Sequence, residues 1–248
     1  MAAYRLAGAL AEAFEVVRGP FAAALGNEVR LRLGGGTALA LRWAHRRSTD
    51  LDFFFSYTDQ ERVREGRKAL EDGLCKRAEV GRVEVRMGGG AKCIVGGVTP
   101  VSFVPAEAFT PDPVSSDTLA GTRVWLEASP EILAKKLVYR VGAGEEAVRA
   151  GQIAPARDVY DLAYASRHHP EVFERAAAAM PFNVLEDALV HLHATDPQMI
   201  AGEGRELVAV ADKSLELGGR DVVVDAIDRH LRGRPPRLPR RPPPAQDR

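Results

Sequence analysis

The sequence is poor in cysteine and contains no long apolar run. Cys75 and Cys93 are the only cysteines among 248 residues, which argues against a disulfide framework and suits a reducing compartment. No apolar run approaches the roughly 18 residues that predict a transmembrane helix, and the first residues lack the apolar core of a signal peptide. We therefore expect a cytoplasmic protein without a membrane partner.

The sequence also lacks net charge, because 34 basic residues balance 34 acidic ones. A protein without an overall positive field is not drawn to nucleic acid at long range, so any contact with RNA must come from local basic patches. The residues are 46% hydrophobic, which is enough for a proper core in one large domain or two small ones.

One stretch, Leu33–Phe55 (LGGGTALALRWAHRRSTDLDFFF), combines several patterns. It indicates the end of a strand, a glycine turn, a helix Ala38–Trp43 opened by Thr37, a basic loop, and a strand with Asp50 and Asp52. Side chains two positions apart leave the same face of a strand, with Cα atoms roughly 6–7 Å apart. Two such carboxylates can bind one or two hard divalent cations together with phosphate oxygens.

Each part of this stretch also has an ordinary interpretation. The glycines Gly34 to Gly36 let backbone amides approach an anion, but a glycine run before a helix is usually only a turn. His45, Arg46 and Arg47 would stabilise the C-terminus of the helix by about 0.3–1 kcal/mol each. Ser48 would be a simple turn residue. Only the ordered combination within so few residues is specific.

A second block of polar residues lies about a hundred residues further along the chain. Ser129 is the expected N-cap of a helix that contains Lys136 and Arg140. The later segment Arg-Asp-x-x-Asp-Leu places Asp158 and Asp161 on one helical face. Taken alone, these features predict solvated helices with ion pairs such as Arg157–Asp158, worth under about 1 kcal/mol.

Together the two blocks resemble the motifs of a known family. Gly-Gly-Thr, His-Arg-x-Ser and Asp-x-Asp come first, and Lys-Leu and Arg-Asp-x-x-Asp-Leu follow in the same order. The chain is thereby similar, from roughly Leu33 to Leu162, to AbiEii/AbiGii-type nucleotidyltransferases, the toxins of bacterial abortive-infection toxin–antitoxin systems. The resemblance implies an α/β (α+β) fold: a DNA polymerase β-like nucleotidyltransferase core with a small mixed sheet, followed by a helical C-terminal part.

The resemblance also implies roles for the matching residues. Asp50 and Asp52 would hold Mg²⁺ or Mn²⁺ and, with Lys136 and Asp158, form the catalytic set. Lys136, rather than Lys135, would contact the triphosphate, and Asp158 would help to orient the nucleophile. The nucleotide-binding residues would be Gly35, Gly36, Thr37, Arg46, Ser48 and Lys136. Asp161 would fix its helix or Arg140.

The resemblance is incomplete at one strand. Polymerase β-like enzymes commonly place a third metal-binding acid there, but Val101–Val104 contains Ser102 and no carboxylate. Glu84 is the nearest acid, and it is better suited to pair with Arg82 or Arg86. Either two aspartates hold the metal with substrate phosphates, or an acid from elsewhere completes the site.

The remaining pattern gives the domain organisation. We expect a nucleotidyltransferase core over residues 1–128, a helical domain over 129–232 and a disordered Pro/Arg-rich tail over 233–248. The expected core elements are a helix Tyr4–Leu25 broken at Gly19–Pro20, strands Val29–Leu33, Gly81–Met87, Ala91–Val95, Val98–Val104 and Val124–Leu126, and a helix Asp59–Leu74. The expected C-terminal helices are Glu171–Met180, Asn183–His193, Met199–Leu217 and Val222–Leu231.

The implied reaction is metal-dependent nucleotidyl transfer. An acceptor hydroxyl would attack the α-phosphate of a nucleoside triphosphate (NTP) and release pyrophosphate. A tRNA 3′ end and a protein hydroxyl are both candidate acceptors, and a cognate antitoxin is a candidate partner. Two alternatives stay open: a degenerate module that only binds nucleotide or a partner, which Ser102 favours slightly, and a metal-dependent phosphohydrolase.

Overall fold

An eight-stranded mixed sheet forms the centre of the protein in the computed structural model, which describes residues 2–26, 29–86, 90–142, 148–196, 198 and 207–233. The strands lie in the order β1-β7-β8-β2-β3-β6-β5-β4. Their bounds are β1 (Ala3–Tyr4), β2 (Arg32–Leu33), β3 (Leu51–Ser56), β4 (Val80–Val85), β5 (Ala91–Val95), β6 (Thr99–Ala106), β7 (Val114–Leu119) and β8 (Trp125–Glu127). This arrangement confirms the predicted α/β class with a mixed sheet.

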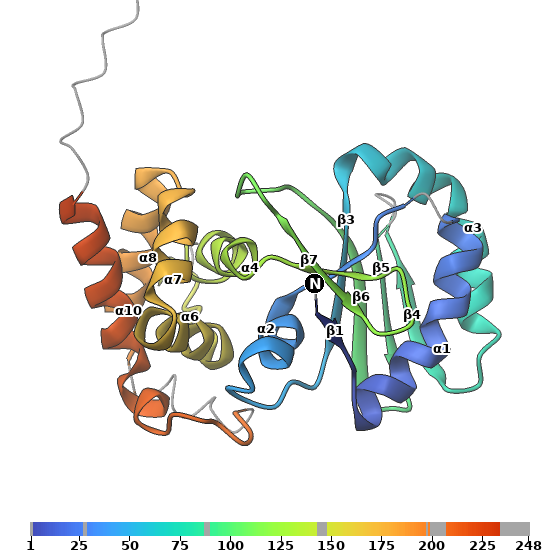
Figure 1. Cartoon of the computed structure of the whole chain (residues 1–248), viewed down its shortest axis with the longest axis horizontal. Helices are drawn as coiled ribbons and strands as arrows, with labels where there is room; N and C mark the ends of the chain where they lie inside the picture. The colour runs from blue at the N-terminus through green and yellow to red at the C-terminus, as the bar shows by residue number, and fades with distance from the viewer. Residues whose placement is uncertain are drawn as a thin grey trace, which may run out of the picture.

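The helices fall into two groups (Figure 1). The first group belongs to the core: α1 (Gly8–Leu25), α2 (Gly35–Trp43), the 3₁₀ turn η1 (Tyr57–Asp59) and α3 (Gln60–Cys75). The second group follows the last strand: α4 (Ser129–Lys136), the π-helical turn η2 (Leu137–Val141), α6 (Ala156–His168), α7 (Pro170–Ala178), α8 (Phe182–Ala194) and α10 (Ser214–Gly233). In Figure 1 the sheet with α1 and α3 lies on one side, the later helices lie on the other, and α2 lies between them. No helix in the described ranges is long and apolar enough to cross a lipid bilayer.

One face of the sheet is apolar and the other presents the polar residues. Phe53 and Phe103 point to the apolar face, where Phe14 of α1 stacks on Phe53 at 5.8 Å and Phe21 stacks on Phe103 at 5.2 Å between ring centroids. Because side chains alternate along a strand, Asp52 and its cross-strand neighbour Ser102 point to the opposite face. The aromatic packing therefore fixes which face carries the predicted carboxylates.

The predicted break in the first helix is wrong. Helix α1 continues through Pro20, and its first residue is Gly8 because Tyr4 pairs with Leu119 in the unpredicted strand β1. Pro20 is buried against α3, where a Cβ on Gly73 would lie only 3.2 Å from the proline ring. This packing against α3 compensates for the hydrogen bond that proline removes from a helix interior.

Other elements match the predictions with shifted bounds. The three strands β4 to β6 form the predicted antiparallel meander, and Glu84 pairs with Arg82 at 2.6 Å. The predicted strand Val29–Leu33 corresponds to β2, which contains only Arg32 and Leu33. Strand β7 was not predicted. Ala128, not Ser129, is the N-cap of α4, and Ser129 is its first residue.

The predicted helix Met199–Leu217 is largely wrong where it can be compared. Residues 199–206 lie outside the described residues, and residues 207–213 are not helical. Their backbone instead bonds the loop after α2: Arg47 donates to the Val208 carbonyl at 2.8 Å and Ala211 donates to the His45 carbonyl at 2.7 Å. Helix α10 then begins at Ser214, whose amide bonds Asp212 Oδ1 at 3.1 Å.

The boundary between the predicted domains stays a prediction. All described strands precede Ser129, and of the described helices after it, α4 and α6 pack on α2 as well as on other C-terminal helices. Residues 234–248, which include nearly all of the predicted disordered tail, lie outside the described residues.

Candidate active site

The polar face of the sheet carries one row of residues across neighbouring strands. Asp52 lies opposite Ser102, which in turn lies opposite Lys92. On the other side of Asp52 lies Gly34, because β2 pairs with β3. Glu127 lies beyond Gly34, because β2 also pairs with β8. The row therefore joins the glycine turn and the Asp-x-Asp strand, which the sequence separates by a helix and a loop.

The glycines of the turn are required by close neighbours. Gly35 has φ +60°, and a Cβ on it would lie 2.6 Å from Asp52 Oδ2. A Cβ on Gly36 would overlap the guanidinium of Arg46. Glycine thus lets a carboxylate and a guanidinium both approach the first turn of α2, where unpaired backbone amides favour an anion.

Thr37 and Ser48 hold Asp50 in place. The Thr37 hydroxyl lies 2.7 Å from the Ser48 hydroxyl and donates to the backbone carbonyl of Asp50, while Ser48 donates to Asp50 Oδ1 at 3.0 Å. Arg157 Nη1 approaches Asp50 Oδ2 at 3.4 Å from α6. The carboxylate is therefore oriented from both sides.

Asp52 is half-buried and contacts Ser102. The Ser102 hydroxyl donates to Asp52 Oδ1, so the residue in place of a third acid is a hydrogen-bond donor to the carboxylate. Burial raises the pKa of Asp52, the nearby charge of Asp50 raises it further, and the bond from Ser102 opposes this rise. A divalent cation between the two carboxylates would relieve the same repulsion.

Lys136 of α4 and Asp158 of α6 are in direct contact. The Lys136 ammonium bonds Asp158 Oδ1 and lies 3.0 Å from Asp161 Oδ2, while Arg140 Nε bonds Asp158 Oδ2 at 2.8 Å. Although burial opposes its charge, Asp158 has a lowered pKa because of Lys136 and Arg140. Burial likewise disfavours the charged form of Lys136, yet the two aspartates raise its pKa.

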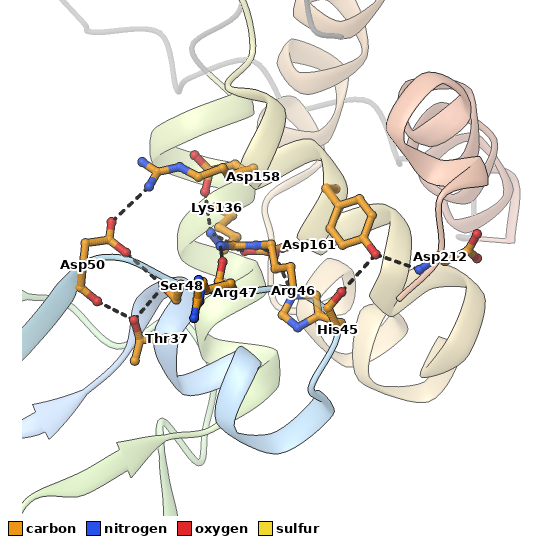
Figure 2. A network of polar contacts seen from close by, with 12 residues as sticks. Thr37, His45, Arg46, Arg47, Ser48, Asp50, Lys136, Asp158, Asp161 and Asp212 are labelled. Carbon is orange, nitrogen blue, oxygen red and sulfur yellow. Dashed lines mark hydrogen bonds and ion pairs between the residues drawn. The ribbon is translucent and has the colours of Figure 1, made fainter. Parts of the chain in front are cut away.

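Asp161 anchors the loop after α2 to the later helices. It is fully buried, with Arg46 Nε at 2.6 Å, Arg46 Nη2 at 2.8 Å and His45 Nε2 at 2.7 Å from its oxygens. The cations Lys136 and Arg46 outweigh burial and hold the pKa of Asp161 well below its usual range. Figure 2 shows these contacts continuing from His45 to Asp212 through Tyr160. The Tyr160 hydroxyl donates to the His45 carbonyl at 3.2 Å and accepts from the Asp212 amide at 3.1 Å. The prediction that Asp161 fixes Arg140 is wrong, because Arg140 bonds Asp158.

Most of these residues surround one cavity of about 330 Å³, whereas Thr37, Ser48, His45 and Asp161 lie behind its lining. Six basic and four acidic side chains line it, so the lining is positive overall and suits an anion of several charges. The lining residues are Gly35, Gly36, Arg46, Asp50, Asp52, Phe54, Lys92, Ser102, Val104, Glu127, Ile132, Lys135, Lys136, Tyr139, Arg140, Arg157 and Asp158.

The structure brings most of the predicted site residues to this cavity. Thr37 and Ser48 are the exceptions, since they stand behind Asp50 and line a neighbouring groove instead. Sequence reasoning missed Glu127, Phe54 and Tyr139 as cavity residues. The only signal for Glu127 was a carboxylate at a strand end directly before the Ser129 helix.

Within the described ranges, no three His, Cys, Asp or Glu side chains are grouped to hold a metal ion. The two carboxylates of Asp50 and Asp52 nevertheless have the hard oxygen donors that Mg²⁺ and Mn²⁺ prefer, and Mg²⁺ is usually bound by one or two carboxylates plus substrate phosphates. The donor set thus fits a cation that needs the substrate to complete its coordination.

Several solved structures resemble this chain in fold. A putative nucleotidyltransferase from Helicobacter pylori superposes with a TM-score of 0.50 at 15% identity, covering 91% of this chain and 96% of that one. The protein JHP933 from H. pylori (TM-score 0.47, 12% identity, 92% and 94% covered) and the antibiotic-resistance factor ANT(2″)-Ia (TM-score 0.45, 21% identity, 73% and 97% covered) are further structural neighbours. No curated protein matches the chain.

The fold is therefore that of the polymerase β-like nucleotidyltransferases. The family model "Nucleotidyl transferase AbiEii toxin, Type IV TA system" matches residues 22–236. The chain belongs to this AbiEii family, as the two motif blocks predicted.

Proposed function

We propose that the protein is a metal-dependent nucleotidyltransferase that moves the nucleoside monophosphate of an NTP to an acceptor hydroxyl. The observation that supports this most is the meeting of Asp50 and Asp52 with the amide-rich turn at Gly35 and with Lys136 in one positive cavity. Membership of the AbiEii family supports the same reaction type.

The proposed role of each residue follows from its charge. Asp50 and Asp52 would hold Mg²⁺ or Mn²⁺, which when bound supplies positive charge to the substrate phosphates. The amides of Gly35 and Gly36 and the Lys136 ammonium would stabilise the negative charge of the triphosphate. Chemistry of this kind depends mainly on positioning and electrostatic stabilisation rather than on covalent catalysis.

Asp158 would orient the acceptor hydroxyl. Its carboxylate is charged, lines the cavity and is held from both sides by Lys136 and Arg140. The lowered pKa makes it a weak proton acceptor in this arrangement, so orientation of the nucleophile fits it better than proton removal.

The candidate acceptors are a tRNA 3′ end and a protein hydroxyl, and the biological role we propose is that of a toxin neutralised by a cognate antitoxin. The family description supports the toxin role. The free thiols of Cys75 and Cys93 are compatible with a reducing cytoplasm.

One assay tests this function. The protein is incubated with each labelled NTP, Mg²⁺ and total tRNA, and the products are separated. Labelled RNA with released pyrophosphate is the expected result. Free phosphate or nucleoside monophosphate would support a phosphohydrolase, and retained intact NTP would support a binding module; either outcome contradicts transfer to tRNA.

A further inference from the structure

One buried carboxylate in the cavity has no role in the proposed transfer. Glu127 ends β8, two strands away from Asp52, and its side chain is fully buried. Its side chain extends across Gly34, where a Cβ would overlap Glu127 Oε2 and lie 2.6 Å from the ring of Phe54. Glycine at this position therefore gives the carboxylate access to the cavity.

The two oxygens of Glu127 have different surroundings. Oε1 accepts a hydrogen bond from Lys135 and lies 3.8 Å from Arg32 Nε. Oε2 is buried without a hydrogen-bond partner among the described residues. Buried polar atoms normally find a partner, and a carboxylate oxygen in particular accepts hydrogen bonds strongly. A ligand in the cavity would supply the missing donor.

Lys135 is fixed beside this carboxylate. Its ammonium lies 4.2 Å from the centroid of the Phe54 ring and 3.5 Å from Glu131 Oε1. Glu131 itself is held by the amides of Phe109 and Thr110, at 3.0 and 2.9 Å from its Oε2. The pair of Glu127 and Lys135 is therefore preorganised before any ligand enters.

The position of this pair indicates which part of an NTP it would meet. The phosphates are expected at Asp50, Asp52 and Lys136, and Asp52 lies two strands away from Glu127 in the sheet. Phe54, Ile132 and Tyr139 add apolar surface to the lining, and flat rings or sugars pack well on such side chains. A phosphate is a poor partner for Glu127 because both are negative, whereas a neutral N–H or O–H group is a good one.

We propose that Glu127, with Lys135, determines nucleotide specificity by accepting a hydrogen bond through Oε2 from the nucleoside part of the NTP. This inference rests on the proposed function, because it requires an NTP in the cavity. The donor is either an N–H group of the base or a ribose hydroxyl.

Calorimetric titration with Mg²⁺ and no acceptor tests the proposal on the full chain. The probes are ATP, GTP, CTP and UTP, the 2′-deoxy and 3′-deoxy forms of the tightest binder, and inorganic tripolyphosphate. We expect Glu127→Gln to weaken the tightest NTP about tenfold or more, as for a lost hydrogen bond to a charged group, and to leave tripolyphosphate unchanged within about twofold. If Glu127→Gln reduces the differences in affinity among the four NTPs, the donor is a base N–H. If it reduces the difference in affinity between the ribose and deoxyribose forms, the donor is a ribose hydroxyl.

Two further variants control for folding and charge. Glu127→Asp keeps the charge beside Lys135 and Arg32 but withdraws it by one methylene, about 1.5 Å, so it should lose the same discrimination even if Glu127→Gln does not fold. Glu131→Gln removes the other partner of Lys135 without facing the cavity, and it should keep the wild-type ranking.

The outcomes distinguish a failure of this inference from a failure of the proposed function on which it rests. An unchanged ranking in the Glu127 variants, an equal loss of tripolyphosphate binding, or the same effect in Glu131→Gln overturns the role of Glu127 alone. A wild-type protein that binds neither NTP nor tripolyphosphate overturns both the proposed function and the inference.

Discussion

The carboxylate of Asp158 accepts a hydrogen bond from the ammonium of Lys136, across 22 positions of sequence. The lysine expected to contact the triphosphate thus directly contacts the carboxylate expected to orient the nucleophile. Arg140 occupies the second oxygen of the same carboxylate. The two proposed roles, nucleotide contact and acceptor positioning, would therefore be linked through one buried ion pair.

Asp158→Asn should separate binding from transfer. Asparagine keeps the shape of the side chain, and Asp161 still neutralises Lys136, so NTP affinity should change little. Transfer should fall by roughly 10²-fold, the loss expected when a reacting group is misplaced by about 1 Å. Calorimetry with NTP beside single-turnover transfer measures both quantities. Normal transfer, or equal loss of binding and transfer, would contradict the role of Asp158.

The two neighbouring lysines should have different effects. Adjacent helix residues point about 100° apart, and Lys136 contacts Asp158 and Asp161 while Lys135 contacts Glu127 and Glu131. Lys136→Ala should therefore weaken binding of Mg²⁺-tripolyphosphate more than Lys135→Ala does. The opposite order in a titration would show that Lys135 is the triphosphate contact, and no effect from either would reject the motif.

Asp161→Asn should destabilise the fold rather than act only on catalysis. Removing the negative partner from buried Arg46 and Lys136 leaves uncompensated buried charge, which costs roughly 3–5 kcal/mol of unfolding free energy. Urea denaturation measures this cost. Glu84→Gln is the matched control, because its exposed pair with Arg82 is worth under about 1 kcal/mol. Equal stability of the two variants would contradict the anchoring role.

The contribution of Asp161 should also depend on pH. Its folded-state pKa is depressed, so its stabilising effect is present above the unfolded pKa of about 3.9 and is lost as pH falls towards the folded value. The difference in unfolding free energy between wild type and Asp161→Asn should thus be constant above about pH 5 and shrink below about pH 4. A difference that grows on acidification would show that the carboxylate is not held charged by Arg46 and Lys136.

Ser102→Ala should weaken metal binding. The hydroxyl donates to Asp52 and counteracts the rise in the pKa of this carboxylate that burial causes. Loss of such a supporting partner typically costs about 10–100-fold in metal affinity, and we expect the lower end. Titration with Mn²⁺ measures it. The control is Ser56→Ala on β3, the strand of Asp52, because Ser56 only caps the following turn. Unchanged Mn²⁺ affinity in Ser102→Ala would separate Ser102 from the metal site.

The sequence predicted the site residues that local patterns place, and it missed those placed by strand pairing. Asp52 follows from strand β3 and Asp50 from its place directly before that strand, and the glycine turn follows from the helix after it. Glu127 reaches the cavity only because β8 pairs in parallel with β2 and brings it beside Gly34. Strand β7 has the polar sequence VSSDTL and forms because it pairs with β1 and β8 rather than because of intrinsic strand preference. No sequence pattern therefore predicted it.

The contacts of Thr37 and Ser48 could not be predicted from the sequence either. The family resemblance assigned Thr37 and Ser48 to nucleotide binding, and that assignment stays a prediction. Their hydroxyls bond Asp50 and each other, which only the loop after α2 can arrange. Likewise, i,i+3 spacing put Asp158 and Asp161 on one helical face, but it could not show that Asp158 faces the cavity while Asp161 binds Arg46 and His45 behind it.

Transfer of label by Asp50→Asn and Asp52→Asn tests the central claim most directly. Each loss removes a charge from a site that must hold a divalent cation against phosphate repulsion. With NTP labelled at the α-phosphate, Mg²⁺ and total tRNA, wild type and the exposed control Asp72→Asn should label RNA and release pyrophosphate. Both site variants should stay folded and do neither. Wild-type transfer by either variant would contradict the claim that these two aspartates hold the catalytic metal.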